Sequence, residues 1–265
     1  MFDLAFRDLR FPRLGAMRSG TAFSPVSLFA NDEAGVWFDP SDMTTLSQDS
    51  AGTTPVTAVG QPVGLMLDKS GNGHHATQAT ASKRPTYQSD GTLHWLAFDG
   101  VDDGLTTGAI NLSGTAKVTF HSAQTFLPGS LARGLHFGAF LTGHFWFNTP
   151  TSSSAVELSA NGGAIQSTPT TVVGTGAHVY TGKIDFTAPL VSLAVDQNTP
   201  VTNVASLGAA TGFATDVLSI GSQVGGSRHL AGNIYSVILR GALSSNAEVS
   251  STEKSLAKKS GVALP

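Results

Sequence analysis

From residue 35 onward the chain is a series of short apolar runs separated by turn-forming residues, and this pattern limits the possible folds more than any other feature. Turn signals built from glycine, asparagine, aspartate, proline and serine recur about every ten to fifteen positions, which favours an antiparallel sandwich over βαβ units. In KVTFHSAQTF (117–126), Val118, Phe120, Ser122 and Gln124 share one parity, as in a strand with two different faces. Further runs lie at 95–98, 134–147, 177–186, 190–197, 217–223 and 234–241. The pattern predicts an all-β, antiparallel sandwich.

Composition excludes several classes of partner and site. Charged residues make up only 12% of the 265 residues and the net charge is −3, so no concentrated basic surface is expected and we expect no nucleic-acid partner. Cysteine is absent, which excludes disulfides, thiolate metal sites and cysteine nucleophiles. Asp3 and Arg7 interrupt the N-terminal apolar residues, so we expect no signal peptide and synthesis in the cytoplasm. No segment approaches the roughly 20 apolar residues of a membrane span, so we expect no membrane insertion.

Residues 1–33 differ from the rest of the chain. Phenylalanines and leucines alternate with arginines, and Pro12 and Pro25 make a long helix unfavourable. We expect an extended N-terminal arm over 1–33 that docks on a partner protein or on the body of the fold, followed by a single domain over 34–265.

One helix is expected, at the C-terminus. Ser245 and Glu248 have the spacing of a capping box, and Gly261 can end the helix. Leu256 and Ala257 belong to its apolar stripe.

The stretch LDKSGNGHHATQ (67–78) combines a carboxylate with a turn. Gly71 and Gly73 tolerate positive φ, and Asp68 can accept hydrogen bonds from the amides that the turn leaves unpaired. The alternative is a calcium site, but calcium takes about six to eight oxygens and this stretch offers one carboxylate. We favour a strand corner.

A second acidic stretch, FDGVDDGL (98–105), holds Asp99, Asp102 and Asp103. These carboxylates can brace the amides of a tight turn. Together with Asp68 they could instead hold Ca²⁺, if the fold brings the two loops together. We favour the turn over the calcium site and expect no cofactor, with Ca²⁺ as the one alternative.

Three stretches in order resemble a known family. LDKSGNGHHATQ, LAFDGVDDGL and LAGNIYSVILRGALSSNAEV are similar to landmarks of the laminin-G-like group of concanavalin A-like lectin/glucanase domains. The preceding stretch from GVWFDPSD to the SGNG corner resembles the opening of such modules in tailed-phage and prophage virion proteins. The resemblance implies a concanavalin A-like jelly roll over about 34–262. It also implies a virion location, which accounts for the lack of a signal peptide and of cysteine.

Catalysis is not expected. Relatives that hydrolyse glycans carry Glu-x-Asp-x-x-Glu along one strand, and retaining hydrolysis needs two carboxyls about 5 Å apart. This chain has four glutamates, none in that pattern: Glu33, Glu157, Glu248 and Glu253. No Gly-x-Ser-x-Gly elbow occurs either.

Glycan binding fits the aromatic stretch HFWFNTPTSSS (144–154). Sugars are held by aromatic faces and by hydrogen bonds to polar side chains. Alternation places Phe145 and Phe147 on one face and Trp146 with His144 on the other. We therefore assign Trp146, His144 and Asn148 as the candidate glycan-binding residues, while Trp37 and Trp95 are expected in the core.

The sequence thus predicts a non-enzymatic virion protein that displays a lectin-like domain for host-surface glycan or receptor binding, as a tail-fibre, baseplate or head-surface component. Its expected partners are other virion proteins, contacted through the arm, and a host-surface glycan; a homo-oligomer is expected by analogy with fibre proteins. The alternatives are a purely architectural decoration protein, and after it a bacterial surface-glycan adhesin or a glycan hydrolase.

Overall fold

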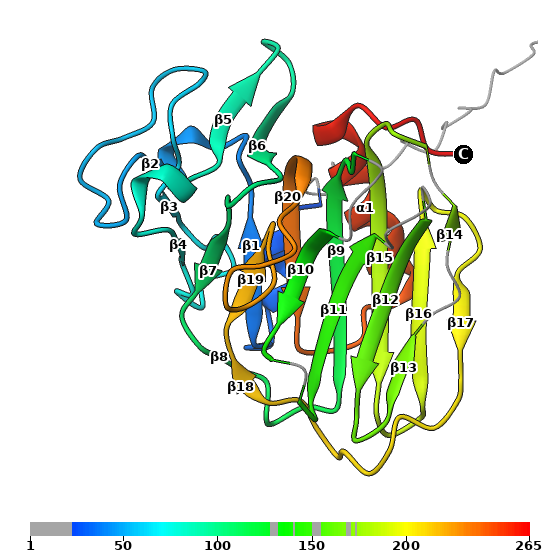
Figure 1. The fold of residues 1–265 in the computed structure, drawn as a ribbon. Helices are drawn as coiled ribbons and strands as arrows, with labels where there is room; N and C mark the ends of the chain where they lie inside the picture. The colour runs from blue at the N-terminus through cyan, green and yellow to red at the C-terminus, as the bar shows by residue number, and fades with distance from the viewer. Residues whose placement is uncertain (1–22, 128–131, 140, 150–154, 168–170, 173) are drawn as a thin grey trace, which may run out of the picture.

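The computed structural model describes residues 23–127, 132–139, 141–149, 155–167, 171–172 and 174–265. Two antiparallel sheets, named A and B here, pack face to face with one hydrophobic core between them (Figure 1). The predicted antiparallel jelly-roll sandwich with a C-terminal helix is confirmed.

Sheet A has eight strands. Their order is β17 (Val201–Asn203), β16 (Leu190–Val195), β15 (His178–Asp185), β9 (Lys117–Gln124), β20 (Ala231–Arg240), β6 (His94–Asp99) and β5 (Thr86–Ser89), and β1 (Gly35–Phe38) also pairs with β20.

Sheet B has ten strands. Their order is β13 (Ile165–Ser167), β12 (Ala155–Asn161), β11 (His144–Thr149), β10 (Ala132–Phe137), β19 (Leu218–Ile220), β7 (Leu105–Thr107), β4 (Ala76–Thr77), β3 (Leu65–Met66) and β2 (Leu46–Ser47), and β14 (Thr171–Val172) pairs with β12. A small separate sheet joins β8 (Ile110–Asn111) to β18 (Thr215–Asp216), and two short 3-10 helices lie at η2 (Met43–Thr45) and η3 (Ala81–Lys83).

The alternation predicted for residues 117–126 is confirmed in β9. Val118 and Phe120 lie in the core between the sheets, and Ala123 lies in a second apolar cluster on the outside of sheet A. β9 is buried on both faces because a helix covers the outer one.

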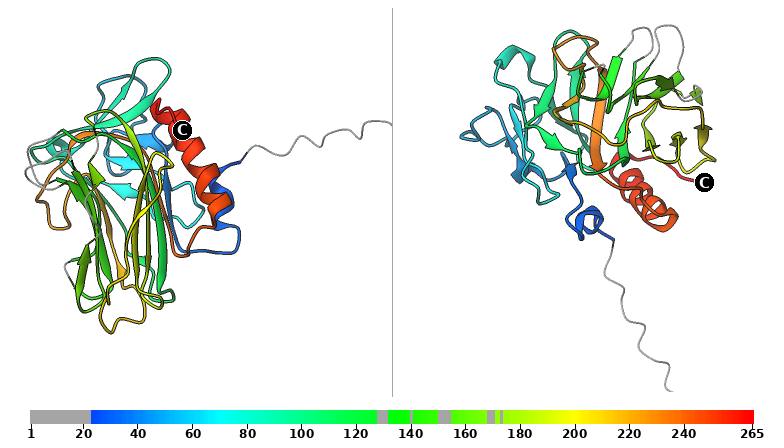
Figure 2. Two further views of the ribbon diagram at one scale, coloured as in Figure 1. Left: turned by 90° about the vertical axis from the view of Figure 1, so that its right-hand side faces the viewer. Right: turned by 90° about the horizontal axis from the view of Figure 1, so that it is seen from below.

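That helix is α1 (Asn246–Ser260), and it covers sheet A next to the 3-10 helix η1 (Pro25–Phe29) (Figure 2). The capping box of Ser245 and Glu248 is present, and Gly261 ends the helix at φ +71°, as predicted. Leu256 packs in the second cluster with Trp37 and Leu28. In the described part of the chain, no helix has the length and apolarity needed to cross a membrane.

Residues 23–33, assigned to the arm from sequence, pack against the domain. Leu28 is fully buried, and the Glu33 carboxylate pairs with Arg240 of β20 at 2.5 Å. The described segment therefore belongs to the body of the fold. Residues 1–22, the rest of the predicted arm, lie outside the described residues.

The run 134–147 forms two paired strands, β10 and β11. Gly138 and Gly143 adopt φ values of +73° and +82° at the ends of the connection, a conformation that suits glycine.

Candidate functional site

The outer face of sheet B carries the polar residues of β11. Phe145 and Phe147 are fully buried in the core between the sheets, as the alternation predicted. His144, Trp146 and Asn148 alternate with them and therefore lie on the opposite face. This face is named the Trp146 face below.

Cross-strand pairing builds a polar array around Trp146. On β10, His136 lies opposite Trp146 and Arg133 lies opposite Asn148. On β12, Ser159 lies opposite Trp146 and Glu157 lies opposite Asn148. Directly opposite residues of an antiparallel pair share one face, so these side chains form two neighbouring rows.

The side chains of these rows contact one another. The Arg133 guanidinium lies over the Trp146 ring, 5.6 Å from its centroid, and donates a hydrogen bond to the Asn148 side-chain oxygen. The His136 ring meets the indole edge-on, with 6.1 Å between centroids. The Ser159 hydroxyl donates to Glu157 at 2.6 Å and shares a hydrogen bond of 2.9 Å with the Ser167 hydroxyl. The array thus offers cationic, amide, hydroxyl and carboxylate groups beside one aromatic ring.

Burial controls the charges of this array. Arg133 is 2% exposed, and burial lowers its pKa to about 10, so it stays cationic at neutral pH. Burial, together with the nearby Arg133 charge, lowers the pKa of His136 to about 3, so its ring is neutral. Trp146 is 6% exposed, whereas Glu157 and Ser167 are half-buried at the rim.

His144 is held apart from this pair of rows. Its ring contacts Asp216 at 3.0 Å and the Leu141 carbonyl at 2.9 Å. A Cβ at Gly138 would lie 1.6 Å from the His144 ring, so the glycine leaves the space that the imidazole occupies. The structure therefore brings Trp146 and Asn148 together through their shared contact with Arg133. His144 does not join them, and its contacts stabilise the β10–β11 hairpin.

Arg133 was not identified from the sequence, and a β-bulge explains why. Arg133 has the parity of Leu135 and Phe137, which are core residues, so strict alternation would bury it between the sheets. The register shifts between Arg133 and Leu135, leaving Gly134 as an extra residue, and this turns Arg133 to the Trp146 face. The glycine at 134 was the one available signal for such a bulge.

The acidic stretch forms a compact cluster. Carboxylate oxygens of Asp99, Asp102 and Asp103 lie within 4.8 Å of one another. Asp99 accepts hydrogen bonds from the Val101 and Asp102 amides, and Asp103 accepts one from the Asp99 amide. Burial, reinforced by the two neighbouring carboxylates, raises the pKa of Asp103 to about 6. These oxygens fit a calcium ion only in part, because two of the carboxylates already serve backbone amides.

Asp68 does not belong to the acidic cluster found among the described residues. Its carboxylate accepts hydrogen bonds from the amides of Trp37, Ser70 and His74, at 2.8 to 3.1 Å. Gly71 and Gly73 have positive φ. Asp68 therefore braces the SGNG corner and ties it to β1, and the interpretation as a strand corner is confirmed.

No family model and no curated protein matches the sequence. Solved structures share the fold. An arabinofuranosidase complexed with arabinofuranosyl-alpha-1,2-xylobiose has a TM-score of 0.61 at 13% identity, over 90% of this chain and 65% of that chain. Botulinum neurotoxin type C, whose cell entry depends on two ganglioside molecules, has a TM-score of 0.56 at 7% identity, over 85% and 52%.

A Trypanosoma rangeli sialidase in complex with 2,3-difluoro-KDN has a TM-score of 0.53 at 12% identity, over 84% of this chain and 32% of that chain. This chain thus spans about half of the neurotoxin chain and a third of the sialidase. At these identities the likeness establishes the lectin-like β-sandwich fold alone.

Proposed function

We propose that this chain is a non-catalytic, glycan-binding module of the lectin type, and that the Trp146 face holds the ligand. The observation that carries the proposal is the cross-strand array in which Arg133 and Asn148 flank an indole on one sheet face. Sugar recognition combines an aromatic ring with convergent polar groups, and this array places both on one sheet face. Similar folds in proteins named for gangliosides and an arabinofuranosyl ligand support the same function.

The burial of the array shapes how a glycan would bind. Because Trp146 is almost fully buried, the ligand first meets the half-buried rim residues Glu157 and Ser167. A glycan hydroxyl can donate to Glu157 and accept from Ser167 before the sugar reaches the indole. The rim residues Glu157 and Ser167 therefore make the first contacts with the glycan, and the Trp146 indole adds to the affinity.

The setting we propose is a phage or phage-like particle, in which residues 1–22 attach the domain to other virion proteins and homo-oligomers display it to the host envelope. The support is the sequence resemblance of residues 35–78 to virion modules and the basic-aromatic composition of the first residues. A purely architectural decoration protein is the second candidate, and the observation that favours it is the burial of the Trp146 face.

The test compares the wild-type chain with Trp146→Ala on an array of bacterial surface glycans, followed by calorimetry with the best binder. We expect saturable binding by the wild type and a loss of about tenfold or more in affinity for the variant, about 1.4 kcal/mol. Trp95→Ala is the matched control, because Trp95 packs against Tyr235 on the outside of sheet A. Absence of glycan binding by a folded wild-type chain would favour the architectural function.

A further inference from the structure

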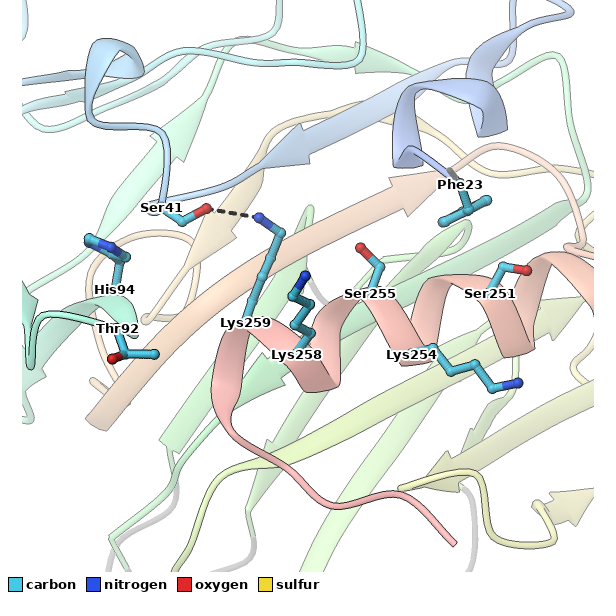
Figure 3. Close-up of a pocket in the computed structure, with 9 residues that line it drawn as sticks. All are labelled: Phe23, Ser41, Thr92, His94, Ser251, Lys254, Ser255, Lys258 and Lys259. Carbon is cyan, nitrogen blue, oxygen red and sulfur yellow. Dashed lines mark hydrogen bonds between the residues drawn. The ribbon is translucent and has the colours of Figure 1, made fainter. Parts of the chain in front are cut away.

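A recessed surface lies on the other side of the sandwich, along α1. This groove has a volume of about 680 Å³, within the range of roughly 300–1,000 Å³ that is typical of small-molecule sites. It is lined by Phe23, Ser41, Thr92, His94, Ser251, Lys254, Ser255, Lys258 and Lys259. Thr92 and His94 lie at one end, on the β5–β6 hairpin, and Phe23 lies toward the other (Figure 3).

Two positive charges of this groove are not neutralised. Lys259 contacts the Asp39 carboxylate at 2.9 Å and the Ser41 hydroxyl at 2.8 Å, so its charge is balanced. Lys254 and Lys258 are exposed, and no carboxylate of the described residues pairs with either ammonium group. Lys254 and Lys258 are four residues apart on one helix, so both lie on the same side of α1. The groove is therefore electropositive along about one turn of the helix.

The rest of the lining suits a hydroxylated ligand. Ser251 and Ser255 are also four residues apart, and both line the groove. Together with Thr92 they present hydroxyl groups that can donate and accept. Phe23 adds an aromatic ring beside them. An oligosaccharide that carries negative charge would contact the ammonium groups, the hydroxyl groups and the aromatic ring.

Residues 1–22 of the chain itself are a poor occupant. They carry four arginines and two aspartates, a net charge of 4 − 2 = +2. The positive charges of Lys254 and Lys258 would repel such a segment. An external anionic ligand is the better match.

We propose that the groove along α1 binds an anionic oligosaccharide, with its carboxylate or sulfate groups placed against Lys254 and Lys258. The inference deepens the proposed glycan binding and rests on it for the sugar component. It assigns charge recognition to sheet A's helix, whereas the Trp146 face lies on the outside of sheet B.

The experiment measures binding of the full chain by calorimetry to three probes: trigalacturonate, its methyl ester, and a sulfated dextran oligosaccharide. We expect binding of an anionic probe, with the ester at least about tenfold weaker, and affinity that falls with added salt. The double variant K254A/K258A should lose about tenfold or more in affinity. The tighter of the two anionic probes identifies the preferred acidic group.

The control is K83A/K117A, which removes the same formal charge from exposed lysines outside the groove, one of which, Lys117, pairs with Asp185. Equal weakening in both double variants, or equal binding of ester and acid, would overturn the proposal. Tighter binding of a polyglutamate peptide than of either anionic saccharide would overturn it in favour of a peptide surface. K254A/K258A also separates the two sites: it should leave binding of a neutral array glycan at the Trp146 face unchanged. Loss of trigalacturonate binding in this variant would support the groove even if no array glycan binds.

Discussion

At the scale of single residues, burial makes the negative charge of the Asp103 carboxylate unfavourable. It is 6% exposed, and its pKa of about 6 exceeds the value of about 3.9 for an unfolded aspartate. The folded state therefore binds the proton more tightly, and stability is lost as the pH rises from about 4 through 6. An uncharged residue at this position should avoid that loss.

We expect Asp103→Asn to unfold with a free energy about 1 to 2 kcal/mol higher than wild type at pH 7, and about equal at pH 4. The amide oxygen can still accept from the Asp99 amide, which now bonds Asp103 at 3.0 Å. Urea denaturation at both pH values checks this, with Asp102→Asn expected to give a smaller gain in the free energy of unfolding.

EDTA should change the melting temperature of the wild type by only about one degree. Destabilisation by Asp103→Asn, together with a large EDTA effect reversed by Ca²⁺, would instead assign the cluster to calcium.

At the scale of elements, η1 packs beside α1 on the outer face of sheet A. Leu28 is fully buried and Phe29 nearly so, in the cluster that includes Leu256 of α1. Each such side chain contributes roughly 1.5–3 kcal/mol through burial. The boundary between arm and domain therefore matters for stability.

Removal of residues 1–33 should lower the free energy of unfolding by about 3 kcal/mol or more, because Leu28, Phe29 and the Glu33–Arg240 ion pair are lost. Removal of residues 1–22 should leave the free energy of unfolding within about 0.5 kcal/mol of the wild-type value. Calorimetry of the two truncated chains measures both changes. Equal stability of the two would show that the packing of residues 23–33 contributes little.

At the scale of the whole molecule, local signals predicted the elements and long-range contacts determined the sites. Turn residues and alternation predicted the sandwich, the Asp68 corner and the capped helix, because each depends on neighbouring positions. The bulge at Gly134 reversed the face of Arg133, and a glycine alone does not show whether a strand holds an extra residue there. The groove along α1 joins residues 23, 41, 92–94 and 251–259, which only the complete fold brings together.

The claim that the Trp146 face binds glycan can be tested at the indole itself. The chain has three tryptophans, so a nitrogen-15 spectrum shows three indole N–H signals, which single substitutions assign. Trp37 is buried beneath α1 and η1, and Trp95 packs on Tyr235 outside sheet A. On titration with the glycan that binds best on the array, we expect a saturable shift of the Trp146 signal, with the other two unmoved. A saturable shift of Trp95 or Trp37 with Trp146 unmoved would contradict glycan binding at the Trp146 face.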